Sequence, residues 1–154
     1  MAINDAVTAK SRSGYAITYA SCPIFWASKM QTDVTLSTTE SEYVSLSQSL
    51  RDVTSLMQIV DKVRQQFDTG TSAKPILRCT VFEDNSVALE ISNVPKMRPQ
   101  TKHFYNKYHN FREYVWNKTI SILAVDTKDQ VADYLTKPLP KEIFPKHCFA
   151  FLNW

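Results

Sequence analysis

The chain has 154 residues, of which 44% are hydrophobic and only two are glycine, and its net charge is +3. This size and composition predict one ordered domain and exclude a low-complexity or disordered protein. No apolar run approaches the roughly eighteen residues of a membrane span, and no secretory leader pattern is present. Cys22, Cys79 and Cys148 are widely spaced, which predicts reduced, mostly buried thiols. We therefore expect an intracellular protein that is not secreted.

The positive charge is concentrated in one segment. Residues 96–118 hold six basic side chains against one acid, a net +5, whereas the rest of the chain has 12 basic and 14 acidic side chains, a net −2. Such an uneven distribution predicts a basic module that binds a polyanion.

The first expected elements are two β-strands. Residues 1–13 are polar and predict a loop, whereas residues 15–19 and 24–28 alternate and are rich in β-forming side chains. A turn around residues 21–23 separates the two runs. This pattern predicts a hairpin.

A long amphipathic helix is expected next. Ser37 and Glu40 have the spacing of a capping box, and apolar residues then recur every three or four positions up to about Phe67. Glu42 has no part in this cap. It is either a functional carboxylate or an exposed acid favoured by the helix dipole, and the helix alone leaves both interpretations open.

A third strand is predicted over residues 76–82. Asp84 follows at its carboxyl end, where ligands gather in open α/β sheets. The alternative interpretation is that Asp84 or Asn85 only caps the short apolar helix expected through residues 87–91.

The second half of the chain predicts a helix over residues 103–116, a strand over residues 119–125, and a helix that begins at a second capping-box pattern, residues 127–130. Asp133 lies in that helix. Strands that alternate with helices predict an α/β domain over residues 1–154. Its tail, residues 140–154, is expected to dock as a last helix through Phe144, Phe149, Phe151, Leu152 and Trp154.

Glu42, Asp84 and Asp133 could meet at one edge of such a domain. Clustered carboxylates repel unless a cation holds them, and Mg²⁺ prefers oxygen ligands. Two such ions roughly 3.5–4 Å apart support phosphoryl displacement. The spacing of the three acids along the chain does not by itself decide whether they form such a site.

Several short strings, in order and over nearly the whole chain, resemble the ribonuclease H region at the carboxyl end of copia-type retrotransposon polyproteins. The individual strings are weak signals, but the ordered set is specific. They are Lys10-Ser-Arg-Ser-Gly-Tyr15, Cys22-Pro-Ile-Phe-Trp26, Leu36-Ser-Thr-Thr-Glu-Ser-Glu-Tyr43, Phe82-Glu-Asp-Asn-Ser86, Thr101-Lys-His103, Lys107-Tyr-His109, Phe111-Arg-Glu113 and Asp129-Gln-Val-Ala-Asp-Tyr-Leu-Thr-Lys-Pro-Leu139.

The resemblance implies a ribonuclease H-like fold, with a mixed sheet flanked by helices. It implies an endonuclease that cuts the RNA strand of RNA–DNA hybrids during reverse transcription, in the cytoplasm or in virus-like particles. Two Mg²⁺ ions, for which Mn²⁺ can substitute, are implied at Glu42, Asp84 and Asp133, the catalytic residues. Glu40 keeps its capping role.

The chain departs from the family at its start. Family members begin with a hydrophobic strand that bears an Asp and lies in the centre of the sheet. Asp5 falls in the loop beyond that strand, so the first catalytic acid is not assigned to it. We expect a vacant central strand position, filled by a longer polyprotein or by another chain, for which self-association is one route.

The basic module is expected to bind the hybrid. Lys96, Arg98, Lys102 and Lys107 suit phosphate contacts, with salt-sensitive binding, and His103 suits a structural or phosphate-contact role. The adjacent reverse transcriptase region is the second expected partner. Because the first catalytic Asp is not found, another function stays open, that of a catalytically dead remnant that binds nucleic acid or protein.

Overall fold

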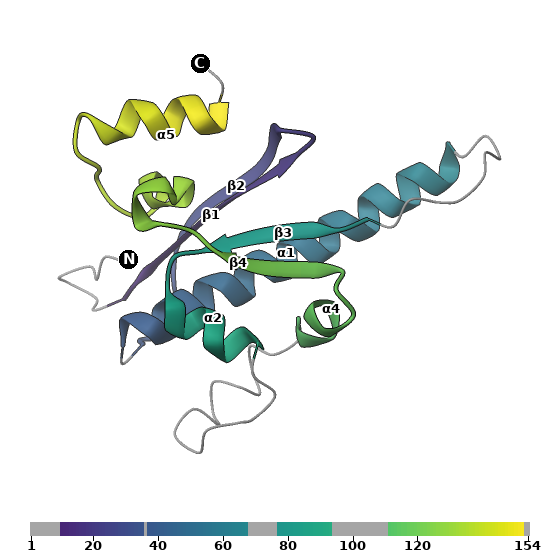
Figure 1. Ribbon diagram of the computed structural model, residues 1–154, viewed down its shortest axis with the longest axis horizontal. Helices are drawn as coiled ribbons and strands as arrows, with labels where there is room; N and C mark the ends of the chain where they lie inside the picture. The colour runs from purple at the N-terminus through teal and green to yellow at the C-terminus, as the bar shows by residue number, and fades with distance from the viewer. Residues whose placement is uncertain (1–9, 36, 68–76, 94–110, 153–154) are drawn as a thin grey trace.

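The computed structural model describes residues 10–35, 37–67, 77–93 and 111–152. These residues form a mixed α/β structure in which a long helix lies against two small sheets (Figure 1). In chain order the elements are β1 Arg12–Tyr19, β2 Cys22–Met30, α1 Thr38–Gln66, β3 Cys79–Glu83, α2 Ser86–Asn93, α4 Arg112–Trp116, β4 Ile120–Ala124, the 3₁₀ helices η2 Thr127–Asp129 and η3 Val131–Leu135, and α5 Ile143–Leu152.

The predicted hairpin is confirmed. Strands β1 and β2 pair antiparallel, and the register shifts between Ile17 and Thr18. The turn is Ala20–Ser21, one residue earlier than expected, and both residues have positive φ angles of 51° and 64°. Such angles match the right-handed twist of a two-residue hairpin.

The predicted long helix is also confirmed as α1. Its amino end is capped by the Ser37 hydroxyl, which accepts a hydrogen bond from the Glu40 N–H at 3.1 Å. Its buried residues all lie in its first half, between Ser41 and Val53, and its carboxyl end projects past both sheets (Figure 1). The hydrophobic core joins the first half of α1 to β4 and to the residues around α4. Its buried members are Tyr43, Val44, Leu46, Leu50, Val53, Phe111, Ile120 and Ile122.

The second sheet contains β3 and β4, which pair in parallel from Cys79 opposite Ile120 to Glu83 opposite Ala124. Helices α2 and α4 belong to the connection between these strands and contact β4. The start of the helix expected over residues 103–116 lies outside the described residues, and its end is α4.

We expected a mixed sheet with a vacant central strand position, and the described residues form two separate two-stranded sheets. In this part of the chain β1 pairs only with β2, and β3 pairs only with β4. A cavity of about 450 Å³ separates the two sheets, lined by residues 14–18 of β1 and residues 79–83 of β3. No strand among the described residues bridges this cavity.

The second capping-box prediction is wrong. Only Thr127–Asp129 form a 3₁₀ helix, η2, and it is capped by the Asp126 side chain, which accepts a hydrogen bond from the Lys128 N–H at 2.9 Å. The Gln130 amide instead donates to the Phe82 carbonyl at 3.2 Å. Because Gln130 has an extended ψ of 94°, the helix stops there and a second 3₁₀ helix, η3, begins.

The tail forms the expected last helix, α5, but only part of its apolar surface is buried. Phe151 packs against Trp26 of β2 and Tyr134 of η3, with ring centroids 6.1 and 5.9 Å apart. Of the other side chains expected to dock, Phe144, Phe149 and Leu152 are exposed, and Trp154 lies outside the described residues. Docking therefore rests on one aromatic side chain together with the buried His147.

Two further expectations concern the cysteines and the membrane. All three cysteines are free thiols, as predicted, but the expectation that they are mostly buried is wrong: Cys22 is exposed beside the hairpin turn, and Cys79 and Cys148 are only partly buried. In the parts of the chain that the structure describes, no helix has both the length and the apolar character needed to cross a membrane.

Candidate acidic site at the end of strand β3

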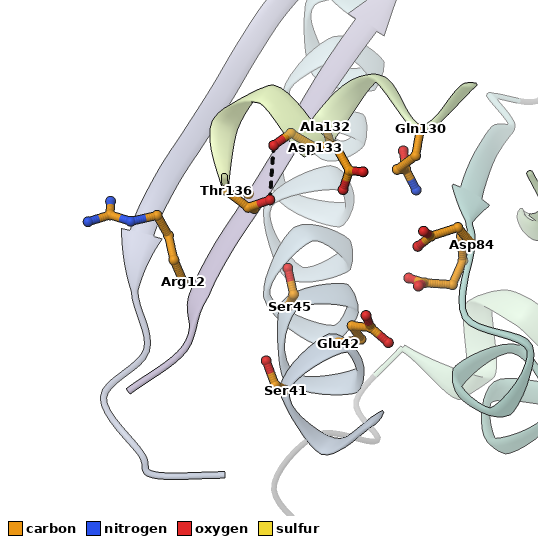
Figure 2. A pocket seen from close by; sticks show the side chains of 11 residues that line it. Arg12, Ser41, Glu42, Ser45, Asp84, Gln130, Ala132, Asp133 and Thr136 are labelled. Atoms are coloured by element: carbon orange, nitrogen blue, oxygen red, sulfur yellow. Dashed lines mark hydrogen bonds between the residues drawn. The ribbon is translucent and has the colours of Figure 1, made fainter. Parts of the chain in front are cut away.

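The three carboxylates singled out from the sequence line the same small cavity. Glu42 extends from the first turns of α1, Asp84 directly follows β3, and Asp133 lies in η3 (Figure 2). Their carboxylates turn toward a common space of about 60 Å³. Three elements that are distant in sequence thus bring the predicted site residues together, with Glu83, Ser41, Ser45, Gln130 and Thr136 as further lining residues.

Asn85 connects the cavity to helix α2. Its Oδ1 accepts hydrogen bonds from the N–H groups of Val87 and Ala88, at 2.9 and 3.0 Å, and so caps α2. Its Nδ2 donates to the Glu42 carboxylate. Asn85 is therefore the cap, and Asp84 lines the cavity.

Glu83 adds a buried acid that the sequence did not single out. Its Oε1 accepts the Asn85 N–H at 3.2 Å. Burial raises the pKa of the Glu83 carboxyl to about 7, and the charges of Asp84 and Glu42 act in the same direction. A proton on Glu83 lowers the repulsion among the acids of the cavity.

Asp133 is buried and ion-paired. It is 5% exposed, and its Oδ2 contacts the Lys137 ammonium one turn further along the chain. Two contacts seat η3 on the hairpin. Gly14 of β1 lies against the side chains of Leu135 and Thr136, and the Ser28 hydroxyl donates to the Leu135 carbonyl at 2.6 Å. The hairpin thereby sets the position of Asp133.

Hydroxyl groups line the other side of the cavity. Ser41 and Ser45 lie one turn apart on α1, and Thr136, directly after η3, lines the same cavity (Figure 2). Ser41 is 1% exposed, and its hydroxyl has no hydrogen-bond partner among the described residues. The Arg12 guanidinium points away, toward the Ser28 hydroxyl at 3.2 Å. The cavity therefore presents acids and hydroxyls, a set that suits a cation or a polar neutral group.

The chemical types of the oxygen atoms that line the cavity suit a divalent cation. The carboxylate oxygens are the ligands that Mg²⁺ prefers, and the buried Ser41 hydroxyl lacks a partner that a ligand or its water could supply. Their spacing fits less well, because no group of three or more His, Cys, Asp or Glu in the described residues is close enough to hold a metal ion. The acids thus line one cavity, but in the described residues their carboxylates are too far apart to bind one ion together.

The predicted nucleic-acid contacts cannot be placed. Lys96, Arg98, Lys102, His103 and Lys107 lie outside the described residues, as does Asp5. Of the basic module, α4 carries Arg112, whose guanidinium lies 6.0 Å from the centre of the Trp116 ring.

Sequence reasoning missed three participants in the site. The spacing of Lys137 from Asp133, four residues, is a known pattern for ion pairs on helical turns and was available as a signal. Glu83 stands beside Asp84 in the sequence, but nothing local indicates its burial. Ser41 likewise carries no sequence signal, because its missing partner is a property of the packed structure.

Comparison with known proteins shows the family to which the chain belongs. No family model matches the chain, and no solved structure gives a significant match. The chain is 31% identical over 91% of its length to the retrovirus-related Pol polyprotein from transposon TNT 1-94 of Nicotiana tabacum. This chain is homologous to retrotransposon Pol polyproteins.

Other Pol relatives extend this homology. Identity is 32% over 87% of the chain for the Pol polyprotein from transposon RE1 of Arabidopsis thaliana, and 25% over 70% for the transposon Ty1-DR1 Gag-Pol polyprotein of Saccharomyces cerevisiae. The chain spans about a tenth or less of the length of these curated relatives. It therefore corresponds to one portion of Pol.

Proposed function

We propose that this portion of Pol is a ribonuclease H-type endonuclease that cuts the RNA strand of RNA–DNA hybrids during retrotransposon reverse transcription. The observation that supports this most is the meeting of Glu42, Asp84 and Asp133 in one cavity. Each is also the residue that the copia-type resemblance marks as a metal ligand.

In this proposal Glu42, Asp84 and Asp133 hold two Mg²⁺ ions, for which Mn²⁺ can substitute. Bound there, the ions would supply an activated water and stabilise the attacking and leaving oxygens. The chain contributes the binding and the orientation: α1, β3 and η3 each present one carboxylate, and Asn85 orients Glu42. The first strand expected in the family would supply the remaining acid.

The basic module would bind the hybrid. Lys96, Arg98, Lys102, His103 and Lys107 suit contacts with the phosphates of a duplex whose A-like shape and 2′-hydroxyls distinguish it from DNA. Such contacts predict binding that weakens steeply as salt rises. The adjacent reverse transcriptase region of Pol is the proposed second partner.

A second candidate function is a non-catalytic module that binds nucleic acid or protein. It is favoured by the incomplete convergence of the acids in the described residues and by the internal partners of Glu42 and Asp133. The two candidates differ in whether bound hybrid is cut.

The test compares hybrid cleavage in Mg²⁺ by this chain and by a longer Pol protein that contains the expected first strand. We expect cleavage by the longer protein and its loss in Asp84→Asn. Asp61→Asn is the matched control, because Asp61 is an exposed acid of α1 that pairs with Gln65. Cleavage that survives Asp84→Asn would overturn the proposal, and binding without cleavage in every form would favour the second candidate.

A further inference from the structure

Lys137 is held on Asp133 by the backbone as well as by charge. The N–H groups of Thr136 and Lys137 both donate to the Asp133 carbonyl, at 3.0 and 3.1 Å, and so does the Thr136 hydroxyl at 3.0 Å (Figure 2). This turn brings the Lys137 side chain back over η3. Its ammonium reaches the Asp133 carboxylate from there.

The pair is largely shielded from solvent. The side chains of Lys137 and Asp133 are 18% and 7% exposed, whereas those of a second pair, Lys146 and Asp129, are 63% and 58% exposed. Charges that water screens poorly attract more strongly, and removal of one partner leaves a buried charge uncompensated. Lys137 therefore neutralises an acid that the cavity would otherwise hold at a high electrostatic cost.

Glu42 is held in a similar way by the Asn85 amide. Two of the three candidate ligands thus have internal donors, and the acids of the cavity form no three-ligand cluster in the described residues. A divalent ion that binds the Asp133 carboxylate must displace the Lys137 ammonium group from it.

We propose that Lys137 is a positioning residue that acts as the internal counter-cation of Asp133 and is displaced when a divalent ion binds. This inference rests on the proposed function, because it assumes that the cavity binds such an ion. Lys137 thereby keeps the ion-free site folded and lowers its affinity for the ion.

The test measures Mn²⁺ binding to the full 154-residue chain by calorimetry, with the thermal unfolding midpoint followed in EDTA and in Mn²⁺. We expect Lys137→Met to lower the midpoint in EDTA and to bind Mn²⁺ at least about tenfold more tightly. Lys137→Arg should restore the affinity of the parent chain because it keeps the charge. Lys146→Met is the matched control and should change neither quantity, because Lys146 pairs with Asp129 at the exposed surface.

Equal or weaker Mn²⁺ binding by Lys137→Met would overturn the inference, as would the absence of binding by both the parent chain and the variant. Binding by the variant alone would support it. If Lys137→Met does not fold, Lys137→Gln serves in its place. The proposed function fails separately, when Asp84→Asn leaves hybrid cleavage by the longer Pol protein unchanged.

Discussion

Gly14 of β1 lies against Thr136 at the end of η3 so closely that a β-carbon at Gly14 would overlap the Thr136 methyl group. It would also lie 3.0 Å from Leu135 Cβ and 3.3 Å from the Ala132 carbonyl oxygen. The absence of a side chain at one position of the hairpin thus lets η3 carry Asp133 into the cavity.

We therefore expect Gly14→Ala to push η3 away from β1 and to destabilise the chain by about 1–3 kcal/mol, the usual cost of overpacking. Urea unfolding measures this change. Thr136→Ser removes the methyl group that is nearest, so the double variant should recover part of the loss, a coupling that a double-mutant cycle detects. Full stability of Gly14→Ala alone would show that η3 is not seated as described.

Tyr15 links β1 to α1. Its hydroxyl donates to the Asp52 carboxylate, and burial, with the Asp52 hydrogen bond and charge as lesser causes, raises the pKa of Tyr15 above its ordinary value. The raised pKa stabilises the folded chain below the unfolded pKa of about 10, and this contribution is lost as the pH rises through the folded value. Tyr15→Phe should cost about 1–3 kcal/mol.

Ultraviolet absorbance of tyrosinate between pH 9 and pH 12 tests this contact. The difference between the parent chain and Tyr15→Phe reports Tyr15 alone, and it should show little ionisation near pH 10 in the folded chain. Tyr19 is the comparison residue, because it is an exposed tyrosine of the same strand. Ordinary titration of Tyr15 would contradict the prediction.

The raised pKa of Glu83 predicts that the stability of the chain depends on pH. Its pKa of about 7 in the folded chain lies above the ordinary value of 4.5 because of burial, so the folded state binds the proton more tightly. The stabilisation is complete below about pH 4.5 and is lost as the pH rises through about 7, with a total on the order of 3 kcal/mol.

Glu83→Gln removes this titration while it keeps the shape of the side chain. The unfolding free energy of the parent chain, minus that of the variant, should fall between pH 4.5 and pH 8. The same experiment with Glu40→Gln is the control, because Glu40 lies in the first turn of α1 at partial exposure. A difference that stays constant with pH would mean that folding does not raise the pKa of Glu83.

Ser41 and Ser49 are two buried serines of α1 with different hydrogen bonding. The Ser49 hydroxyl donates to the Leu46 carbonyl at 2.8 Å, whereas the Ser41 hydroxyl has no partner in the described residues. Ser49→Ala should cost about 1 kcal/mol. Ser41→Ala should be neutral or stabilising, and a loss similar to that of Ser49→Ala in urea unfolding would show that Ser41 is already satisfied.

The cavity between β1 and β3 predicts where a further strand would add. Backbone groups on the edge of a strand pair readily with another strand. In a longer Pol protein that contains the expected first strand, amides of residues 14–18 and 79–83 should gain protection from hydrogen exchange. The amides of residues 24–29 of β2 are the internal control and should change little, since β2 does not line the cavity. Unchanged exchange in β1 and β3 would show that no strand inserts there.

Local patterns were sufficient for much of the fold. The alternation around Tyr15 predicted β1, the three-and-four spacing after Ser37 predicted α1 to within a residue of its end, and the run before Asp84 predicted β3. The pattern around Thr127 failed because a capping-box spacing does not say which nearby oxygen will cap. Asp126 took that role, and the Gln130 side chain bonded to Phe82 instead.

The sequence by itself determined which carboxylates to examine and the elements that carry them, because period and capping are properties of neighbouring residues. Only the tertiary structure decided that Glu42, Asp84 and Asp133 share a cavity, that Asn85 and Lys137 hold two of them, and that Glu83 is buried beside them. These relationships depend on how α1, β3 and the hairpin pack. This packing results from many weak contacts between segments that are distant in sequence, so it cannot be predicted from any one segment.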